Sequence, residues 1–303
     1  MSDDRTLRLG TRHSPLALAQ AAMVRDTILA RCPDLTIDIV EITSEGDVDM
    51  RPLADFPDRG VFATALEREL SAGTIDIAVH SFKDMQLADV DGLTVCAVLA
   101  REDPRDALCN CAAGAIEDLP ADAVIATGSA RRSSILRTLR ADLQPSNIRG
   151  NVGTRLATSA ARGDAACMLA CAGLRRLGRG DEIAIALPVD QCVPDAAQGV
   201  VAIQIASDSP WRTELPWNEI SHDDTAWAAA VERRVARDLG GGCEQPIGVH
   251  VTHVDEAWVC YVFRAPAAGE AGVVHAVAIE RTVTVDVVAD LVLANLPLVG
   301  APS

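Results

Sequence analysis

The stretch Ile75-Asp76-Ile77-Ala78-Val79-His80-Ser81-Phe82-Lys83-Asp84 joins an apolar run, typical of a buried strand, to a polar end. A short run of Ile, Ala and Val bounded by polar residues favours a strand inside a sheet. The chain holds 27 Lys and Arg residues, and Lys83 is the single lysine among them. Lysine is a compact point charge, whereas arginine is a planar fork. Composition alone also allows a lysine that survived by chance on a solvated loop. The residues around Lys83 must therefore show whether it has a function.

Strands and helices alternate on the N-terminal side of this stretch. Ser14-Pro15 is a helix start, because serine is a good N-cap and proline suits the first helical position. The predicted elements are a strand at Thr6–Gly10, a helix from Ser14, a strand at Leu35–Val40, a helix at Val61–Leu70 and a strand at Ile75–His80. This order favours an open, largely parallel sheet.

A second α/β pattern follows the charged, proline-containing segment Arg101–Asp106, which we interpret as a crossing linker. Its predicted elements are a strand at Ala123–Thr127, helices at Ser129–Arg140 and Thr154–Ala161, and a strand at Ala165–Ala170. Val193-Pro194 marks a second break, after which Val200–Ile205 is strand-like and could rejoin the first sheet. Two crossings between two α/β lobes would form a hinged cleft.

The chain changes character from Asp223 onward. A helix at Thr225–Leu239 ends at three glycines, which suit a helix C-terminus. Strands at Trp258–Phe263 and Val273–Ile279 and a helix from Val287 predict a small α+β domain. The predicted division is lobe 1 at 1–99 and 200–218, lobe 2 at 105–193, and a C-terminal domain at 222–303.

Composition excludes several classes of protein. The net charge of −16 argues against a general nucleic-acid binder, whose binding surface is basic. The sequence contains no run of about 18 uncharged apolar residues, so it predicts no membrane span. Met1–Arg5 lacks an apolar signal region, so we expect a cytoplasmic protein whose nine cysteines are reduced. Cys109/Cys111 and Cys167/Cys171 are weak metal motifs, and no metal is expected.

Arginines gather where predicted strands end and helices begin. Free N–H groups and the helix dipole make such turns anion sites. The segments are Thr127–Arg132, Arg149–Arg155, and Ala172–Arg176 in the second lobe, with Arg12, His13 and Ser14 at the equivalent edge of the first. The chain has no GxxxxGKS phosphate loop, so a small molecule with several carboxylates is the expected ligand. Ordinary capped helices with surface arginines remain an alternative.

Two further residues stand out by their neighbours. Asp84 is a lone acid among cations, and in a cleft it could stabilise a developing positive charge or accept hydrogen bonds from a substrate. Cys243 lies in the glycine-rich stretch Leu239–Gly248, where small residues let another group approach. It is therefore a candidate attachment point or nucleophile. A buried structural cysteine is the alternative at this stage.

Taken in order, these segments resemble the porphobilinogen deaminase family. The matching stretches are Thr11–Leu18, Asp76–Asp84, Arg101–Ala107, Gly128–Arg132, Arg149–Leu156, Ala172–Gly178, Gln198-Gly199 and Gly240–Gly248. The resemblance implies two periplasmic-binding-protein-like α/β lobes with a cleft between them and a small α+β C-terminal domain. It also implies a transferase that deaminates four porphobilinogen molecules, joins them head to tail and releases the linear tetrapyrrole hydroxymethylbilane.

The resemblance further implies roles for single residues. Asp84 would be the catalytic carboxylate, and Cys243 would hold a dipyrromethane cofactor through a thioether. Cofactor contacts would come from Ser81, Lys83, Thr127, Ser129, Arg131, Arg132, Gly150, Asn151 and Arg155. Substrate contacts would come from Arg12, Ser14, Arg149, Arg176 and Gln198. The implied protein is a monomer that takes porphobilinogen and binds neither nucleic acid nor membrane.

The chain departs from the family pattern in places. Pro52–Gly60 carries an acid and a proline where the family has a basic, glycine-rich loop, and Met85-Gln86 replaces the usual Val-Pro. Two other classes share these features. One is a two-lobed polycarboxylate-binding protein or sensor, and the other is an inactive relative without turnover.

Overall fold

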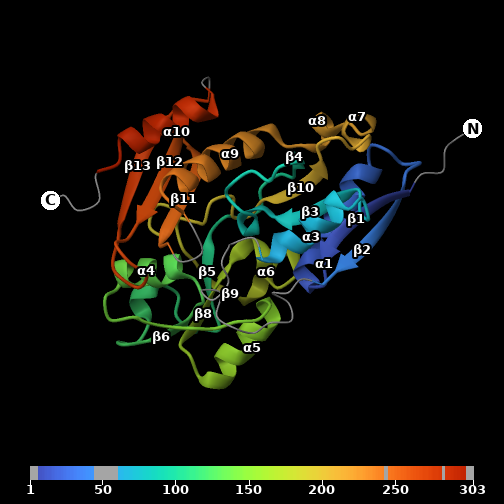
Figure 1. The fold of residues 1–303 in the computed structure, drawn as a ribbon. Coiled ribbons are helices and arrows are strands. Elements are labelled where there is room, and N and C mark those ends of the chain that lie inside the picture. Colours follow the sequence, from blue (N-terminus) through green and yellow to red (C-terminus); the bar gives the residue numbers. More distant parts are fainter. Residues whose placement is uncertain (1–5, 44–60, 242–244, 282–283, 298–303) are drawn as a thin grey trace, which may run out of the picture. The chain divides into compact units, whose positions relative to one another are not determined.

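The computed structural model describes residues 6–43, 61–241, 245–281 and 284–297 (Figure 1). The chain forms two compact units. Unit 1 contains residues 1–102 and 199–226, and unit 2 contains residues 103–198 and 227–303. The first boundary falls within the predicted linker Arg101–Asp106.

Unit 1 is built on a five-stranded sheet of order β2-β1-β3-β10-β4. Its strands are β1 (Thr6–Arg12), β2 (Thr36–Ile42), β3 (Ile77–Ser81), β4 (Leu93–Val98) and β10 (Val201–Ala206). β1 runs parallel to β2 and β3, whereas β10 is antiparallel to both of its neighbours. The predicted open, largely parallel sheet is therefore confirmed, and so is the return of the chain to it at Val200–Ile205.

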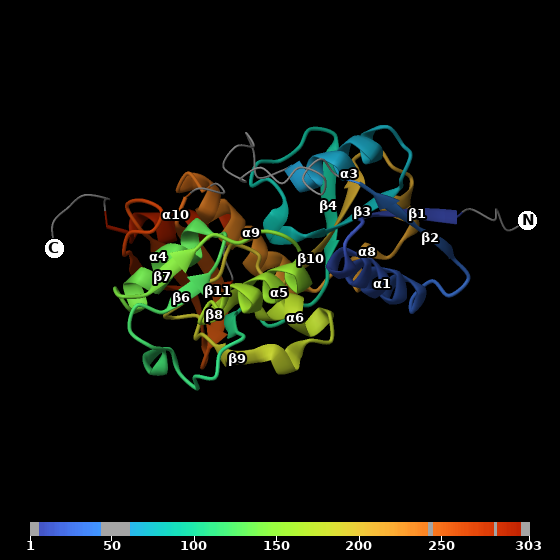
Figure 2. The same cartoon turned by 90° about the horizontal axis from the view of Figure 1, so that it is seen from below.

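Helices cover both faces of this sheet. α1 (Pro15–Leu29) packs Val24 and Ile28 against the Ile77 and Val79 side chains of β3. α3 (Val61–Ser71) packs Leu66 against Ala78. Because successive strand residues point to opposite faces, α1 and α3 lie on opposite sides of the sheet (Figure 2). The short helices α7 (Trp211–Glu214) and α8 (Trp217–Ile220) pack in the same apolar cluster as α1.

Unit 2 contains a second five-stranded sheet, of order β7-β6-β8-β5-β9. Its strands are β5 (Asp106–Cys109), β6 (Val124–Ala126), β7 (Gln144–Ser146), β8 (Ala166–Ala170) and β9 (Ile183–Ala186). α4 (Ala130–Leu139) packs on the Ile125 face. α5 (Val152–Arg162) and α6 (Cys171–Arg176) pack on the Ala126 face.

The C-terminal residues of unit 2 add an antiparallel sheet of order β11-β12-β13. Its elements are β11 (Ile247–Val254), β12 (Ala257–Arg264) and β13 (Val273–Ile279), with helices α9 (Asp223–Asp238) and α10 (Val285–Ala294). Phe263 of β12 is fully buried in the same apolar cluster as Ile125 and Ile135. Ser134 Oγ of α4 also accepts a hydrogen bond from Gly269 N at 2.9 Å. The predicted α+β composition is confirmed, whereas the division into three domains stays a prediction.

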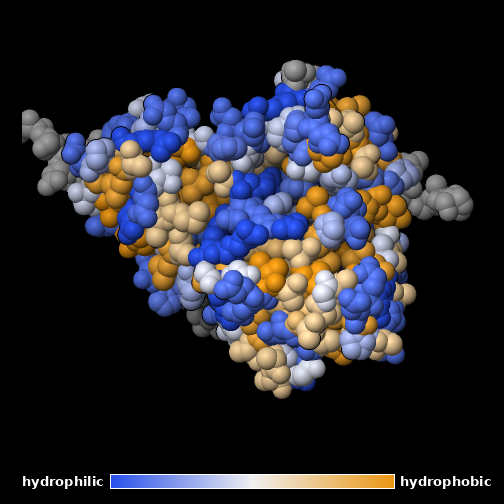
Figure 3. Space-filling view, turned by 180° about the vertical axis from the view of Figure 1, so that it is seen from behind, coloured by the Kyte–Doolittle hydropathy of each residue, from blue (hydrophilic) through white to orange (hydrophobic). Residues whose placement is uncertain are grey.

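The described helices were compared with the requirements of a membrane span. None of them combines the length and the apolar character that crossing a bilayer requires. On the face drawn in Figure 3, hydrophilic and hydrophobic residues are intermixed.

Candidate functional site

A pocket in unit 1 brings together residues from β1, α1, α3 and β3. It encloses about 430 Å³ of empty space, part of it open to solvent. Its lining residues are Arg12, Ser14, Leu16, Ala17, Gln20, Ala63, Val79, His80, Ser81 and Asp84. Four residues predicted from sequence, Arg12, Ser14, Ser81 and Asp84, therefore share one pocket.

The carboxyl end of β1 fixes one wall of this pocket. Ser14 is the N-cap of α1, as predicted, and its Oγ accepts a hydrogen bond from Ala17 N at 3.2 Å. Thr11 Oγ1 donates to Ala17 O at 3.1 Å, and Ser14 N donates to Arg12 O at 3.0 Å. The turn that carries Arg12 and Ser14 is thus held by the helix that follows it.

The carboxyl end of β3 fixes the opposite wall. The chain passes directly into a single 3₁₀ turn, Phe82–Asp84. Phe82 and Met85 are buried, and Phe82 N donates to Val200 O at 3.0 Å. Lys83 and Asp84 between them are half-buried. The apolar residues anchor the turn, so the backbone presents Asp84 to the pocket from a fixed position.

Sequence reasoning missed Gln20, which joins the two walls. Its side chain is only 2% exposed, and its Nε2 donates to Ser81 Oγ at 2.8 Å. Gln20 lies on the same helical face as Val24 and Ile28, the buried stripe of α1. A polar side chain at a buried helical position must find a partner, and that signal is present in the sequence.

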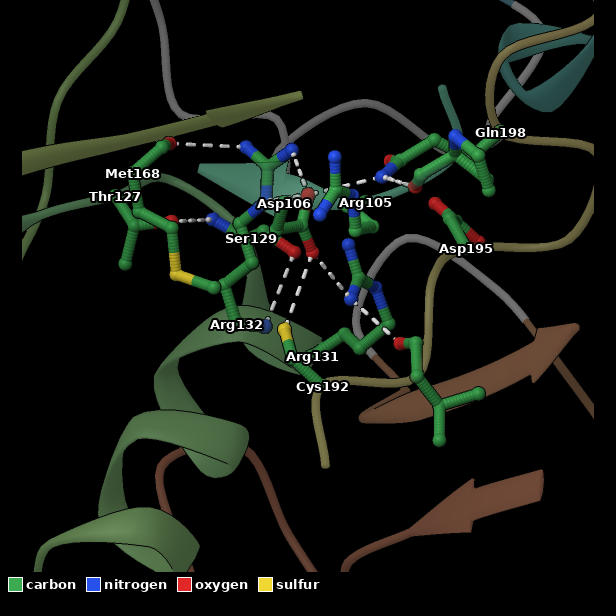
Figure 4. Close-up of polar contacts among 12 residues, drawn as sticks. Arg105, Asp106, Thr127, Ser129, Arg131, Arg132, Met168, Cys192, Asp195 and Gln198 are labelled. Atoms are coloured by element: carbon green, nitrogen blue, oxygen red, sulfur yellow. Dashed lines mark hydrogen bonds and ion pairs between the residues drawn. The ribbon is translucent and has the colours of Figure 1, made fainter. Parts of the chain in front are cut away.

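A second polar cluster lies in unit 2, around Asp106 of β5 (Figure 4). Asp106 Oδ2 pairs with Arg131 Nη1 at 2.8 Å. Asp106 Oδ1 pairs with Arg132 Nη2 at 2.7 Å and accepts a second bond from Arg132 Nε at 3.1 Å. Asp106 is fully buried, and the two arginines are 4% and 5% exposed. The structure therefore places the two predicted cofactor arginines on one internal carboxylate.

Electrostatics keep this cluster ionised. Burial alone would raise the pKa of Asp106, but the charges of Arg131 and Arg132 outweigh burial and hold that pKa below its usual range. Burial would lower the pKa of Arg131, and the Asp106 carboxylate raises it instead. Asp106 was interpreted from sequence as part of a charged linker. Its burial opposite two arginines was not visible there.

Two helix N-termini lie close to predicted cofactor or substrate arginines in the chain. Ser129 caps α4 by accepting from Arg132 N, and Asn151 caps α5 by accepting from Thr154 N at 2.9 Å. Arg155 Nε donates to Gly150 O at 2.7 Å, where Gly150 has a φ of +107°. Arg131 Nε and Arg149 Nη1 are buried donors with no hydrogen-bond partner among the described residues.

Other predicted residues are placed differently or lie outside the description. Gln198 is fully buried, and its Nε2 donates to Pro104 O at 2.7 Å and to Asp106 Oδ1 at 2.9 Å. It therefore belongs to the Asp106 cluster, and its substrate contact stays a prediction. Arg176 is the last residue of α6. Cys243 and the segment Pro52–Gly60 lie outside the described residues. Within the described ranges, no group of three His, Cys, Asp or Glu side chains could hold a metal ion.

Several solved structures are similar to this chain at low identity. The periplasmic aliphatic sulphonate binding protein SsuA from Escherichia coli matches at 17% identity and a TM-score of 0.37, over 78% of this chain and 70% of that chain. A periplasmic solute binding protein from Rhodobacter sphaeroides matches at 9% identity and a TM-score of 0.43, over 77% and 81%. The methionine binding protein MetQ matches at 12% identity and a TM-score of 0.46, over 76% and 96%. We draw no functional conclusion from these likenesses.

A family match covers most of the chain. The model described as porphobilinogen deaminase, dipyromethane cofactor binding domain, matches residues 7–213. Both the unit 1 pocket and the Asp106 cluster lie within that range. The match and the two α/β sheets confirm the predicted fold class of two periplasmic-binding-protein-like lobes, while the cleft between them stays a prediction. The chain belongs to the porphobilinogen deaminase family.

Proposed function

We propose that this protein deaminates four porphobilinogen molecules and joins them head to tail on a dipyrromethane primer, releasing hydroxymethylbilane. Membership of the family supports a transferase of tetrapyrrole biosynthesis. The observation that carries the finer proposal is the unit 1 pocket, in which Asp84 lies with Arg12, Ser14 and Ser81. The proposal includes a monomeric, cytoplasmic protein, and light scattering on the purified protein tests its oligomeric state.

The pocket residues suit the chemistry of the substrate. Loss of ammonia from an aminomethylpyrrole leaves positive charge on the ring, and a fixed carboxylate such as Asp84 stabilises that charge as it develops. Porphobilinogen also carries an acetate and a propionate. The Arg12 guanidinium is suited to pair with one of them, and the Ser14 hydroxyl can donate a hydrogen bond to it.

The residues of unit 2 fit a cofactor that carries several carboxylates. Arg131 Nε and Arg149 Nη1 are buried donors without a partner among the described residues, and a ligand carboxylate would satisfy them. When bound, dipyrromethane supplies the primer to which substrate units are added. Lys83, Ser81, Thr127, Ser129, Arg131, Arg132, Gly150, Asn151 and Arg155 would hold it, with Cys243 as the attachment point.

Two measurements test this function. The first is the intact mass of the purified protein, and the second is the product formed after incubation with porphobilinogen and oxidation. We expect a bound dipyrromethane mass that is lost in Cys243→Ser, and a coloured uroporphyrin product. Asp84→Asn should lower the rate by on the order of 10² or more, because it removes the electrostatic stabilisation. The exposed acid Asp89 provides the control, since Asp89→Asn should react like the parent. Binding of porphobilinogen without product would favour a polycarboxylate-binding protein or an inactive relative.

A further inference from the structure

Asp106 organises more than the two arginines that it pairs with. Gln198 donates to its Oδ1, and Cys192 Sγ donates to its Oδ2 at 3.5 Å. Burial raises the pKa of the Cys192 thiol, so the thiol stays a neutral donor beside the carboxylate. Both Asp106 oxygens therefore accept from groups of the protein itself.

The arginines are also fixed at their remaining nitrogens. Arg131 Nη1 donates to Val193 O at 2.7 Å, and Arg132 Nη1 donates to Met168 O at 3.1 Å. Arg131 Nε, which is buried, has no partner among the described residues. The contacts hold each guanidinium in one orientation and leave a donor of Arg131 unused.

Charge explains why a carboxylate is needed at this point. Arg131 and Arg132 are adjacent in the chain, buried and both positive, so they would repel each other in a medium of low dielectric constant. Asp106 offsets one of these two positive charges, and Asp195 also acts on Arg131.

The same cluster is joined to the strand that follows Cys243. Val249 N of β11 donates to Pro194 O at 3.0 Å, next to the Val193 carbonyl that Arg131 contacts. A Cβ placed on Gly248 would lie 2.5 Å from Val193 O, so this strand approaches the segment too closely for a side chain. The arginines and the start of β11 are thus held against one short segment of backbone.

We propose that Asp106 is a positioning residue that fixes Arg131 and Arg132 for a cofactor carboxylate without touching the cofactor. This inference rests on the proposed function. It predicts that removing the Asp106 charge lowers cofactor loading even when the protein folds.

Four proteins test the inference: the parent, Asp106→Asn, Asp106→Glu and Asp142→Asn. Asp142 is the matched control, because it pairs with Arg140 at the other end of α4. We expect the intact mass to show full loading for the parent and for Asp142→Asn. Loading of Asp106→Asn should fall on the order of tenfold, because misplaced binding groups lose much of their effect. Asp106→Glu keeps the charge but shifts it by one methylene, and should also load poorly.

Thermal stability separates positioning from a merely structural role. In the parent, the cofactor should raise Tm above that of Cys243→Ser, which cannot load. If Asp106 has only a structural role, Asp106→Asn should lower Tm equally with Cys243 intact and in the Cys243→Ser background. If Asp106 positions the arginines, Asp106→Asn should reduce the difference in Tm between these two backgrounds. Full loading of both Asp106 variants, with an unchanged difference in Tm, would overturn the inference.

Arginine reactivity tests the inference without the cofactor. In the Cys243→Ser background, phenylglyoxal should spare Arg131 and Arg132 when Asp106 is present and modify them several-fold faster in Asp106→Asn. Equal protection in both proteins would contradict a positioning role. A parent that carries no dipyrromethane would instead contradict the proposed function, and the reactivity measurement would still decide whether Asp106 holds the arginines.

Discussion

Glu67 is a buried carboxyl on α3, 7% exposed, that faces Gln204 of β10. Burial raises the pKa of Glu67, and the hydrogen bond from Gln204 Nε2 at 3.4 Å only partly opposes this. A raised carboxyl pKa means that the folded state binds the proton more tightly than the unfolded chain. Stability from Glu67 is therefore present below the unfolded pKa of about 4.3 and is lost as pH rises through the folded pKa.

Glu67→Gln should remove the loss of stability that ionisation of the buried Glu67 carboxyl causes at neutral pH. The new amide could also donate to Gln204 Oε1, which has no partner among the described residues. We expect the free energy of unfolding to rise by roughly 1 kcal/mol at pH 7 and to change little at pH 4. Urea titrations at both pH values measure this. Glu69→Gln is the control of opposite sign, because Thr74 and Arg68 lower the pKa of Glu69.

Residues whose contacts lie within a few positions in the chain could be predicted from the sequence. Residues whose contacts lie far away in the chain could not. Ser14 was predicted as a helix cap because a cap depends on the next three residues. Asp106 looked like linker charge because its partners lie 25 or more positions away. Only the pairing of β5 with β8 and β9 makes it an interior residue.

At the scale of elements, the helices α1, α3, α4, α5 and α9 were predicted within a few residues, whereas the strands β4, β5, β7 and β9 were missed. β7 and β9 have three and four residues, too few to show alternation. α6 lacks a side-chain cap, and its only sequence signal was a pair of arginines. β7 and β9 exist because the neighbouring strands β6 and β5 complete their hydrogen bonds, which a local pattern does not encode.

β11 depends on glycine at one position. A Cβ on Gly248 would lie 2.5 Å from Val193 O and 3.0 Å from Pro194 O, both backbone atoms that cannot move aside cheaply. Gly248→Ala should therefore push β11 from this segment and cost about 1–3 kcal/mol, as overpacking does. Urea unfolding measures the loss. Gly114→Ala is the matched control, because nothing lies within 4 Å of its added Cβ. Equal stability of the two variants would contradict this contact.

At the scale of the whole molecule, the sequence predicted two crossings of the chain between two α/β lobes. The charged segment Arg101–Asp106 contains the first boundary, after Glu102. A second boundary falls after Gln198, between the break at Val193-Pro194 and the strand that returns to the first sheet. Contacts with Asp106 and with Glu232 keep residues 192–198 in unit 2. A proline break marks a turn, but it does not show on which side the following residues pack.

Glu232 of α9 ties together three segments of unit 2. It is fully buried, and its carboxylate accepts from Ala197 N and from Val251 N, both at 2.7 Å. His250 Nδ1 lies 3.2 Å from the same carboxylate. Glu232→Ala leaves two buried N–H donors unsatisfied, so it should destabilise unit 2 by about 3 kcal/mol.

Hydrogen exchange measured by mass spectrometry shows how far that loss spreads. Because residues 103–198 and 227–303 form one compact unit, Glu232→Ala should reduce protection in β6 and β8 as well as in β11 and β12. Amides of β1 and β3 in unit 1 should keep their protection. Glu219→Ala, at an exposed position of unit 1, should change neither set. Loss confined to β11, β12 and β13 would instead show that residues 222–303 unfold as a separate third domain.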